Sequence, residues 1–181
     1  MSGTAPLGLR PRLTPISAGA TSAVTSRYGS CVSCDSGASK KAKRGADAVA
    51  GSEQAIASTY PNTSVVVTEP VADYLLQASG LVNRTPRAFT SANENGTDPS
   101  PADTAYVLNL VKRRQVASLL VNPQTSTPAI NGLQDAARRA GVPVTQVTET
   151  LPNGTDYLTW QRNTVNQLLA ALQSNRTHAA S

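Results

Sequence analysis

Short apolar runs alternate with segments of helical spacing along residues 46–172. The runs cover residues 64–68, 116–121 and 142–148, and the first of them is apolar on both faces, as in a buried parallel strand. Apolar residues recur at helical spacing in the segments that flank these runs, namely 46–59, 71–79, a segment from 101 past Val111, 128–139 and 157–172. Strand and helix therefore alternate with short connections, which predicts an α/β fold of three layers, a parallel sheet flanked by helices.

Capping residues mark where these helices begin and end. Ser100 precedes Pro101, and Asp103 falls in the first turn, a combination typical of a helix N-terminus. Thr127 precedes a proline in the same way, and Gly141 stands where that helix should stop. The boundaries of these two helices are therefore predicted with a physical reason at each end.

Polar residues directly follow each predicted strand. Ligands of open parallel sheets gather at the carboxyl ends of the strands, so we expect a cleft at this edge. The residues expected to line it are Glu69, Asn122, Gln124 and Thr125, with Glu149 after the last strand. A structural alternative stays open for most of them: an acid before Pro70 is favoured by the helix dipole alone, and polar residues after the second strand close turns and cap helices.

The net charge of +5 belongs to the first 45 residues. They contain seven basic residues and one acid, whereas the rest of the chain contains nine basic and ten acidic residues. No basic face extends into the patterned region and no aromatic residues interleave with the charges, which argues against nucleic-acid binding. We expect residues 1–45 to be disordered or irregular, 46–175 to fold as one lobe, and 176–181 to form a tail.

Candidate catalytic and redox residues are few. Cys31 and Cys34 form a CxxC, but a structural zinc site needs two more ligands and nothing nearby supplies them. The one histidine, His178, lies in the expected tail, so no Ser-His-Asp constellation is expected, and no glycine-rich phosphate loop is present. We therefore expect no enzyme; the alternative, a carboxylate enzyme using Glu69 and Glu149, has no substrate to support it.

No segment is suited to crossing a membrane or directing export. A membrane helix needs roughly 20 apolar residues, and no stretch approaches that. Prolines and arginines interrupt residues 7–24, so no apolar signal region forms there.

Several motifs occur together in a recognisable order. Residues 67–71, 96–103, 120–125 and 140–152 resemble the C-terminal lobe of the zinc and manganese solute-binding proteins of ABC importers, in their actinobacterial-type branch. The likeness covers about residues 45–172. It implies one lobe of a two-lobed protein in which a long helix joins the lobes and histidines and carboxylates bind a metal ion between them.

The resemblance also implies a site, a partner and a place in the cell. It implies that Glu149, after the last strand, is a metal ligand, with a solvated or helix-capping acid as the open alternative. It leaves Glu94 or Asp98 to serve for the ligand after the first strand-helix unit. The cargo would be Zn2+ or Mn2+, the partner an ABC permease, and the location extracytoplasmic or on the cell surface, as in cell adhesion-type lipoproteins of the family. Without a signal peptide, the chain as encoded would stay in the cytoplasm.

The family's N-terminal lobe, with its first two metal histidines, has no counterpart in this sequence. Residues 1–45 look like unrelated sequence joined to the lobe, so the resemblance implies a truncated protein with weak or absent metal binding. The alternative function is a truncated product that folds but neither binds metal nor takes part in transport.

Overall fold

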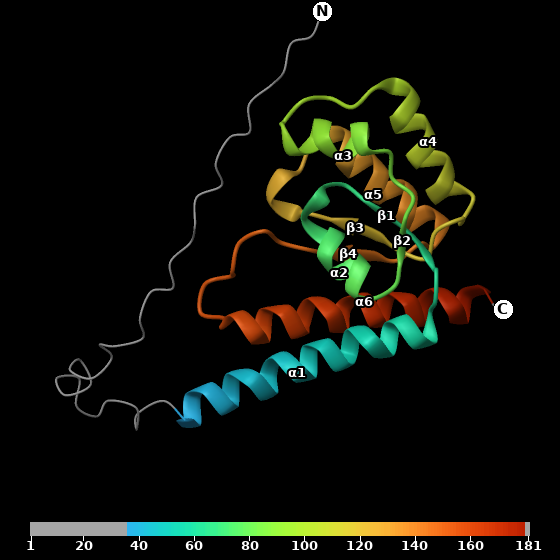
Figure 1. Ribbon diagram of the computed structural model, residues 1–181. Helices are drawn as coiled ribbons and strands as arrows, with labels where there is room; N and C mark the ends of the chain where they lie inside the picture. Colours follow the sequence, from blue (N-terminus) through green and yellow to red (C-terminus); the bar gives the residue numbers. More distant parts are fainter. Residues whose placement is uncertain (1–35, 180–181) are drawn as a thin grey trace, which may run out of the picture. The chain divides into compact units, whose positions relative to one another are not determined.

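The computed structural model describes residues 36–179, and side chains from 37 to 177. Cys31 and Cys34, and the side chain of His178, lie outside the described part, so the predictions for them stay predictions. Within it, a parallel sheet has the strand order β2-β1-β3-β4 (Figure 1). The strands are β1 (Ser64–Val67), β2 (Val82–Asn83), β3 (Leu119–Val121) and β4 (Val144–Gln146). The helices are α1 (Ser36–Thr59), α2 (Asp73–Ala78), α3 (Arg87–Glu94), α4 (Pro101–Lys112), α5 (Pro128–Ala140) and α6 (Tyr157–Ala179), with short 3-10 helices η1 (Pro70–Ala72) and η2 (Pro123–Thr125).

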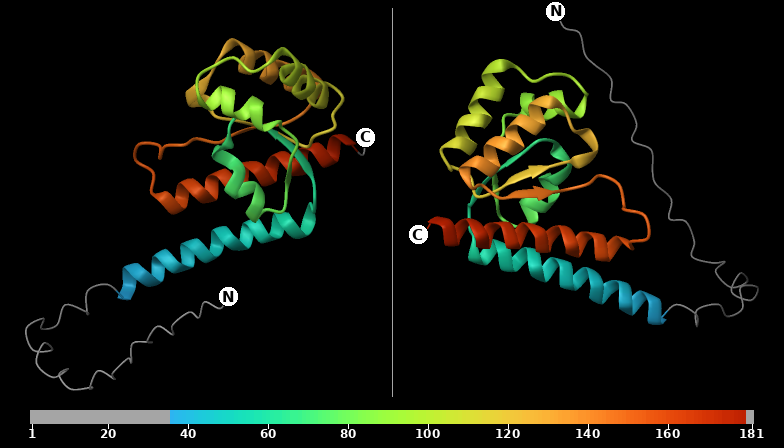
Figure 2. Two further views of the ribbon diagram at one scale, coloured as in Figure 1. Left: turned by 45° about the horizontal axis from the view of Figure 1, so that its top comes forward. Right: turned by 180° about the vertical axis from the view of Figure 1, so that it is seen from behind.

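Helices cover both faces of the sheet, which confirms the predicted three-layer α/β fold. Successive residues of a strand point to opposite faces, so Val66 joins one core cluster while Val65 and Val67 join the other. The first cluster contains residues of α3, α4 and α5, and the second contains residues of α1, α2 and α6. Figures 1 and 2 show the same arrangement, with α4 and α5 on one side of the sheet and α1 and α6 on the other.

The predicted caps of α4 and α5 are confirmed. The Ser100 hydroxyl accepts a hydrogen bond from the Asp103 backbone N–H at 3.1 Å, and the Thr127 hydroxyl accepts one from the Ile130 N–H at 3.2 Å. Gly141 ends α5 in the left-handed conformation, with φ of 70°. These contacts satisfy backbone groups that a helix end otherwise leaves without partners.

The helix predicted over residues 46–59 begins earlier, at Ser36. The prediction treated the basic residues before Ala46 as irregular sequence, but Ala, Lys and Arg are among the best helix formers. The ammonium of Lys43 also lies 3.0 Å from the carboxylate of Asp47, one turn further along α1. The irregular segment predicted up to residue 45 is therefore wrong for residues 36–45.

Two elements were not predicted, and α6 differs from expectation. The two residues of β2 are both exposed and show no strand pattern, and α3 has no side-chain cap that would mark its start.

The last helix extends to Ala179, so it includes most of the predicted tail. Tyr157, the first residue of α6, is 59% exposed, and the buried apolar face of this helix is formed by Val165, Leu168 and Leu172. Of the helices in residues 36–179, none combines the length and the apolarity needed to cross a bilayer.

Candidate functional site

Glu69 follows β1 at the carboxyl edge of the sheet and is almost completely buried, with 1% of its surface exposed. It is the one ionisable residue that is buried within the described part of the chain. Its Oε2 accepts a hydrogen bond from Asn122 Nδ2 at 2.9 Å, and its Oε1 accepts one from the Thr125 hydroxyl. A carboxylate can remain in such a place only when polar partners replace the water that it has lost.

Asn122 is held by the residues that follow β1 and by the turn that follows β3. Its backbone N–H donates to the Thr68 hydroxyl at 3.3 Å, which ties the end of β3 to the end of β1. Its side-chain oxygen accepts from the Gln124 N–H at 3.0 Å and so caps η2. Because that oxygen is engaged in the turn, the amide nitrogen is directed at Glu69.

The end of β4 is joined to the same turn. The Gln124 side-chain oxygen accepts from the Glu149 backbone N–H at 3.2 Å, and its nitrogen donates to the Thr150 hydroxyl at 2.5 Å. The Trp160 indole N–H donates to the Thr148 hydroxyl at 3.0 Å, which fixes this strand end against α6. The turn after β3 therefore links Glu69 on one side to the exposed residue Glu149 on the other.

The other two predicted metal ligands lie outside this network. Glu94 is the exposed last residue of α3 and borders a hollow of about 630 Å³ that Pro70, Asp73 and Arg87 also line. Asp98 is exposed in the segment between α3 and α4. Within residues 36–179, no hydrogen bond joins either acid to Glu69, Asn122 or Gln124.

Nowhere in the described part of the chain do three or more His, Cys, Asp or Glu residues group closely enough to hold a metal ion. The edge contributes carboxylate, hydroxyl and amide oxygens, which are hard donors that Mn2+ accepts readily and that Zn2+ uses beside softer ligands. The described residues of this edge therefore offer oxygen donors but do not by themselves complete a metal site.

Asn93 belongs to the site but was not predicted. It lies on α3, is 5% exposed, and donates from Nδ2 to the backbone oxygen of Thr68 at 2.9 Å. That contact anchors α3 to the residue before Glu69. The sequence carries no signal for it, because α3 itself lacks a recognisable start.

Comparison with known proteins gives one family. The family model described as zinc-uptake complex component A, periplasmic, matches residues 38–171. None of the curated proteins matches the chain.

Solved structures share the fold at low sequence identity. The periplasmic zinc-binding protein TroA from Treponema pallidum is 17% identical, with a TM-score of 0.51 over 74% of this chain and 50% of that one. The SBP FpvC from Pseudomonas aeruginosa in complex with Mn2+ is 14% identical, with a TM-score of 0.50 over 77% of this chain and 50% of that one. The chain thus spans about half the length of these structures. With the family match over most of its described residues, the chain belongs to the zinc-uptake complex component A family.

Proposed function

We propose that this protein captures a zinc or manganese ion as the substrate-binding component of an ABC importer. The observation that carries the proposal is the pair of acids at one edge of the sheet, Glu69 and Glu149, held by a shared turn in a chain of this family. The solved relatives support the choice of cargo, since one is a zinc-binding protein and another is a complex with Mn2+.

Glu69 is suited to be the innermost ligand. An ionised carboxylate offers about four acceptor positions on its two oxygens. Asn122 and Thr125 occupy one position on each oxygen, which orients the group and leaves the others available to a cation. Asn122 and Thr125 are then the outer partners that hold a ligating carboxylate in place.

Glu149 supplies the second carboxylate in this proposal, and Glu94 or Asp98 a third. Gln124 and Thr125 line the cleft between them, and Gln124 positions the backbone at Glu149. A structural zinc ion takes four donors and oxygen-binding cations take more, so carboxylates from this lobe alone give weak binding. The resemblance assigns the remaining donors to a second lobe, whose closure would also exclude water.

The rest of the proposed role follows from the family. The loaded lobe delivers the ion to an ABC permease outside the cytoplasm and performs no covalent chemistry. The specific alternative is a chain that folds but neither binds metal nor takes part in transport.

Isothermal titration of the full chain with Zn2+ and with Mn2+ tests metal capture. Thiolates and imidazole bind zinc by themselves, so the titrations use a background of Cys31→Ser, Cys34→Ser and His178→Ala. We expect one saturable but weak site per chain, with a Kd between about 1 μM and about 1 mM, because this lobe supplies only part of a full donor set. Glu149→Gln and Glu69→Gln should each abolish it, and Asn122→Ala should weaken it about 10- to 100-fold, as loss of an outer partner does.

Asp135→Asn is the matched control, because it removes an exposed acid on α5 that pairs with Arg138. It should leave both titrations unchanged. Absence of saturable heat with either ion would favour the alternative, and binding that survives both glutamate substitutions would place the metal elsewhere.

A further inference from the structure

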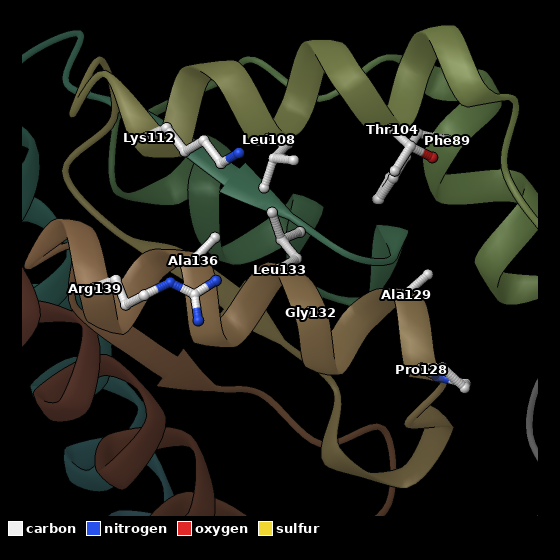
Figure 3. A pocket seen from close by; sticks show the side chains of 10 residues that line it. All are labelled: Phe89, Thr104, Leu108, Lys112, Pro128, Ala129, Gly132, Leu133, Ala136 and Arg139. Atoms are coloured by element: carbon white, nitrogen blue, oxygen red, sulfur yellow. The ribbon is translucent and has the colours of Figure 1, made fainter.

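A groove of about 220 Å³ opens between α4 and α5, on the face of the sheet that these helices cover (Figure 3). Its interior is apolar: Leu108 projects from α4, while Leu133 and Ala136 project from α5. Phe89, from α3, stands at one end and is 3% exposed. The groove shares no lining residue with the network around Glu69.

Two cations stand at the other end of the groove. Figure 3 shows Lys112 and Arg139 at the same end of the groove, in the last turns of α4 and α5. Helix dipoles favour cations in last turns, but they do not select the face of the helix. Lys112 lies four residues after Leu108, and Arg139 three after Ala136, so both fall on the groove face. Neither belongs to either of the ion pairs found within residues 36–179.

Gly132 keeps the middle of the groove open. It lies within α5, where glycine is less favourable than alanine. No backbone requirement accounts for it, since a Cβ at this position would meet nothing within 4 Å and its φ is not in the left-handed region. The side chain that is missing here would project into space that a ligand can use.

We propose that this groove binds a small amphiphilic carboxylate. The carboxylate lies between Lys112 and Arg139, where an anion relieves the repulsion between two cations that form no ion pair within residues 36–179. The aliphatic chain runs past Leu108 and Gly132 toward Phe89, where burial removes apolar surface from water. A volume of about 220 Å³ is below the usual range of about 300–1,000 Å³ for drug-sized ligands, so the ligand has a short or medium chain.

The test is an NMR titration of the full, 15N-labelled chain with sodium octanoate. We expect saturable shifts of the backbone amides of Leu108, Gly132 and Leu133. Acetate supplies the charge without the tail, and 1-octanol supplies the tail without the charge. Both should bind at least about tenfold more weakly, since a charge-assisted contact and several buried methylenes each contribute about 1.4 kcal/mol or more.

Two kinds of variant locate the site. Gly132→Leu fills the groove from within and should abolish the octanoate shifts, while the dispersion of the remaining spectrum reports that the chain is folded. The double variant Lys112→Gln and Arg139→Gln should weaken octanoate about tenfold and leave 1-octanol unchanged. Its matched control, Lys41→Gln with Arg176→Gln, removes the same charge from exposed positions on α1 and α6 and should change neither.

The proposal is overturned by any of three results. Octanoate and 1-octanol binding with equal affinity would show that the cations take no part. Octanoate binding unchanged by the double variant, or unchanged by Gly132→Leu, would place the ligand elsewhere. Absence of saturable shifts in the unsubstituted chain would show that the groove takes no such ligand.

Discussion

Two interpretations of Glu69 follow from the sequence: a residue of the functional cleft, or an acid placed at a helix N-terminus for its interaction with the helix dipole. An acid before a helix-opening proline is expected to complement the helix dipole. The structure shows that its side chain makes no capping hydrogen bond to η1, and that both oxygens are engaged by Asn122 and Thr125 across the sheet edge. Its orientation is therefore set by the site and not by the helix that it precedes.

Gly132 within α5 and Gly141 at its C-terminal cap should respond oppositely to substitution by alanine. Gly132→Ala should stabilise the protein by about 0.5–1 kcal/mol, because alanine restricts the unfolded chain and meets open space in the folded one. Gly141→Ala should destabilise it by about 1–2 kcal/mol, because φ of 70° is unfavourable for any residue with a Cβ. Urea unfolding of the two variants checks both signs; equal effects would contradict the backbone argument.

The direction of the strands is enough to predict which residues lie at the carboxyl edge of the sheet, but it does not predict their hydrogen-bond partners. Glu69, Asn122 and Glu149 follow parallel strands, so their meeting at one edge could be predicted before any contact was known. The hydrogen-bond partners of Glu69 and Asn122 could not be predicted, because they depend on the geometry of the turn at η2. The position of Glu94 could not be predicted for another reason. It depends on α3, and the sequence contains no capping residue that marks where this helix begins.

At the level of elements, α6 depends on the acid that precedes it. Asp156 accepts hydrogen bonds from the Thr159 hydroxyl at 2.6 Å and from the Thr159 N–H at 3.0 Å, and these hold its pKa below the ordinary value for an aspartate. A lowered pKa means that the folded state favours the charged form. The resulting stability is complete above the unfolded pKa of about 3.9 and is lost as pH falls through the folded value.

Asp156→Ala should therefore lower the Tm at pH 7, and the gap from the unsubstituted protein should shrink toward pH 2. Asp156→Asn, which keeps a good capping side chain, should lose less at pH 7 than the alanine variant. Thermal unfolding followed by circular dichroism at both pH values measures the gap. A gap that stays constant with pH would show that the charge on Asp156 contributes nothing.

Elements with strong local signals were predicted, and those fixed by tertiary contacts were not. The prolines and caps of α4 and α5 specify their ends within the sequence itself. In contrast, β2 is a strand only because it pairs with β1, and the Thr85 hydroxyl then continues that edge by accepting from the Val67 N–H at 2.9 Å. The early start of α1 could not be predicted from an apolar period, because the small and polar residues before Ala46 show none, although the Ala, Lys and Arg residues among them favour helix.

At the scale of the whole molecule, one sheet separates two apolar layers and leaves a polar edge. The alternation of Val65, Val66 and Val67 between the two core clusters shows that β1 is buried on both sides. A strand buried in this way can present polar chemistry only at its ends, where Glu69 stands. The fold thereby places Glu69 and Glu149 at one edge and leaves the groove between α4 and α5 as a separate surface.

The most direct test of the central claim is paramagnetic NMR with Mn2+, which locates the ion as well as detecting it. At substoichiometric Mn2+ we expect the amide signals of Gln124 and Thr150, at the carboxyl edge, to broaden first. The signal of Gly141, which precedes β4 at the opposite edge, should stay sharp. Glu69→Gln with Glu149→Gln should remove the broadening. Broadening centred elsewhere, or unchanged in that double variant, would contradict metal capture at this edge.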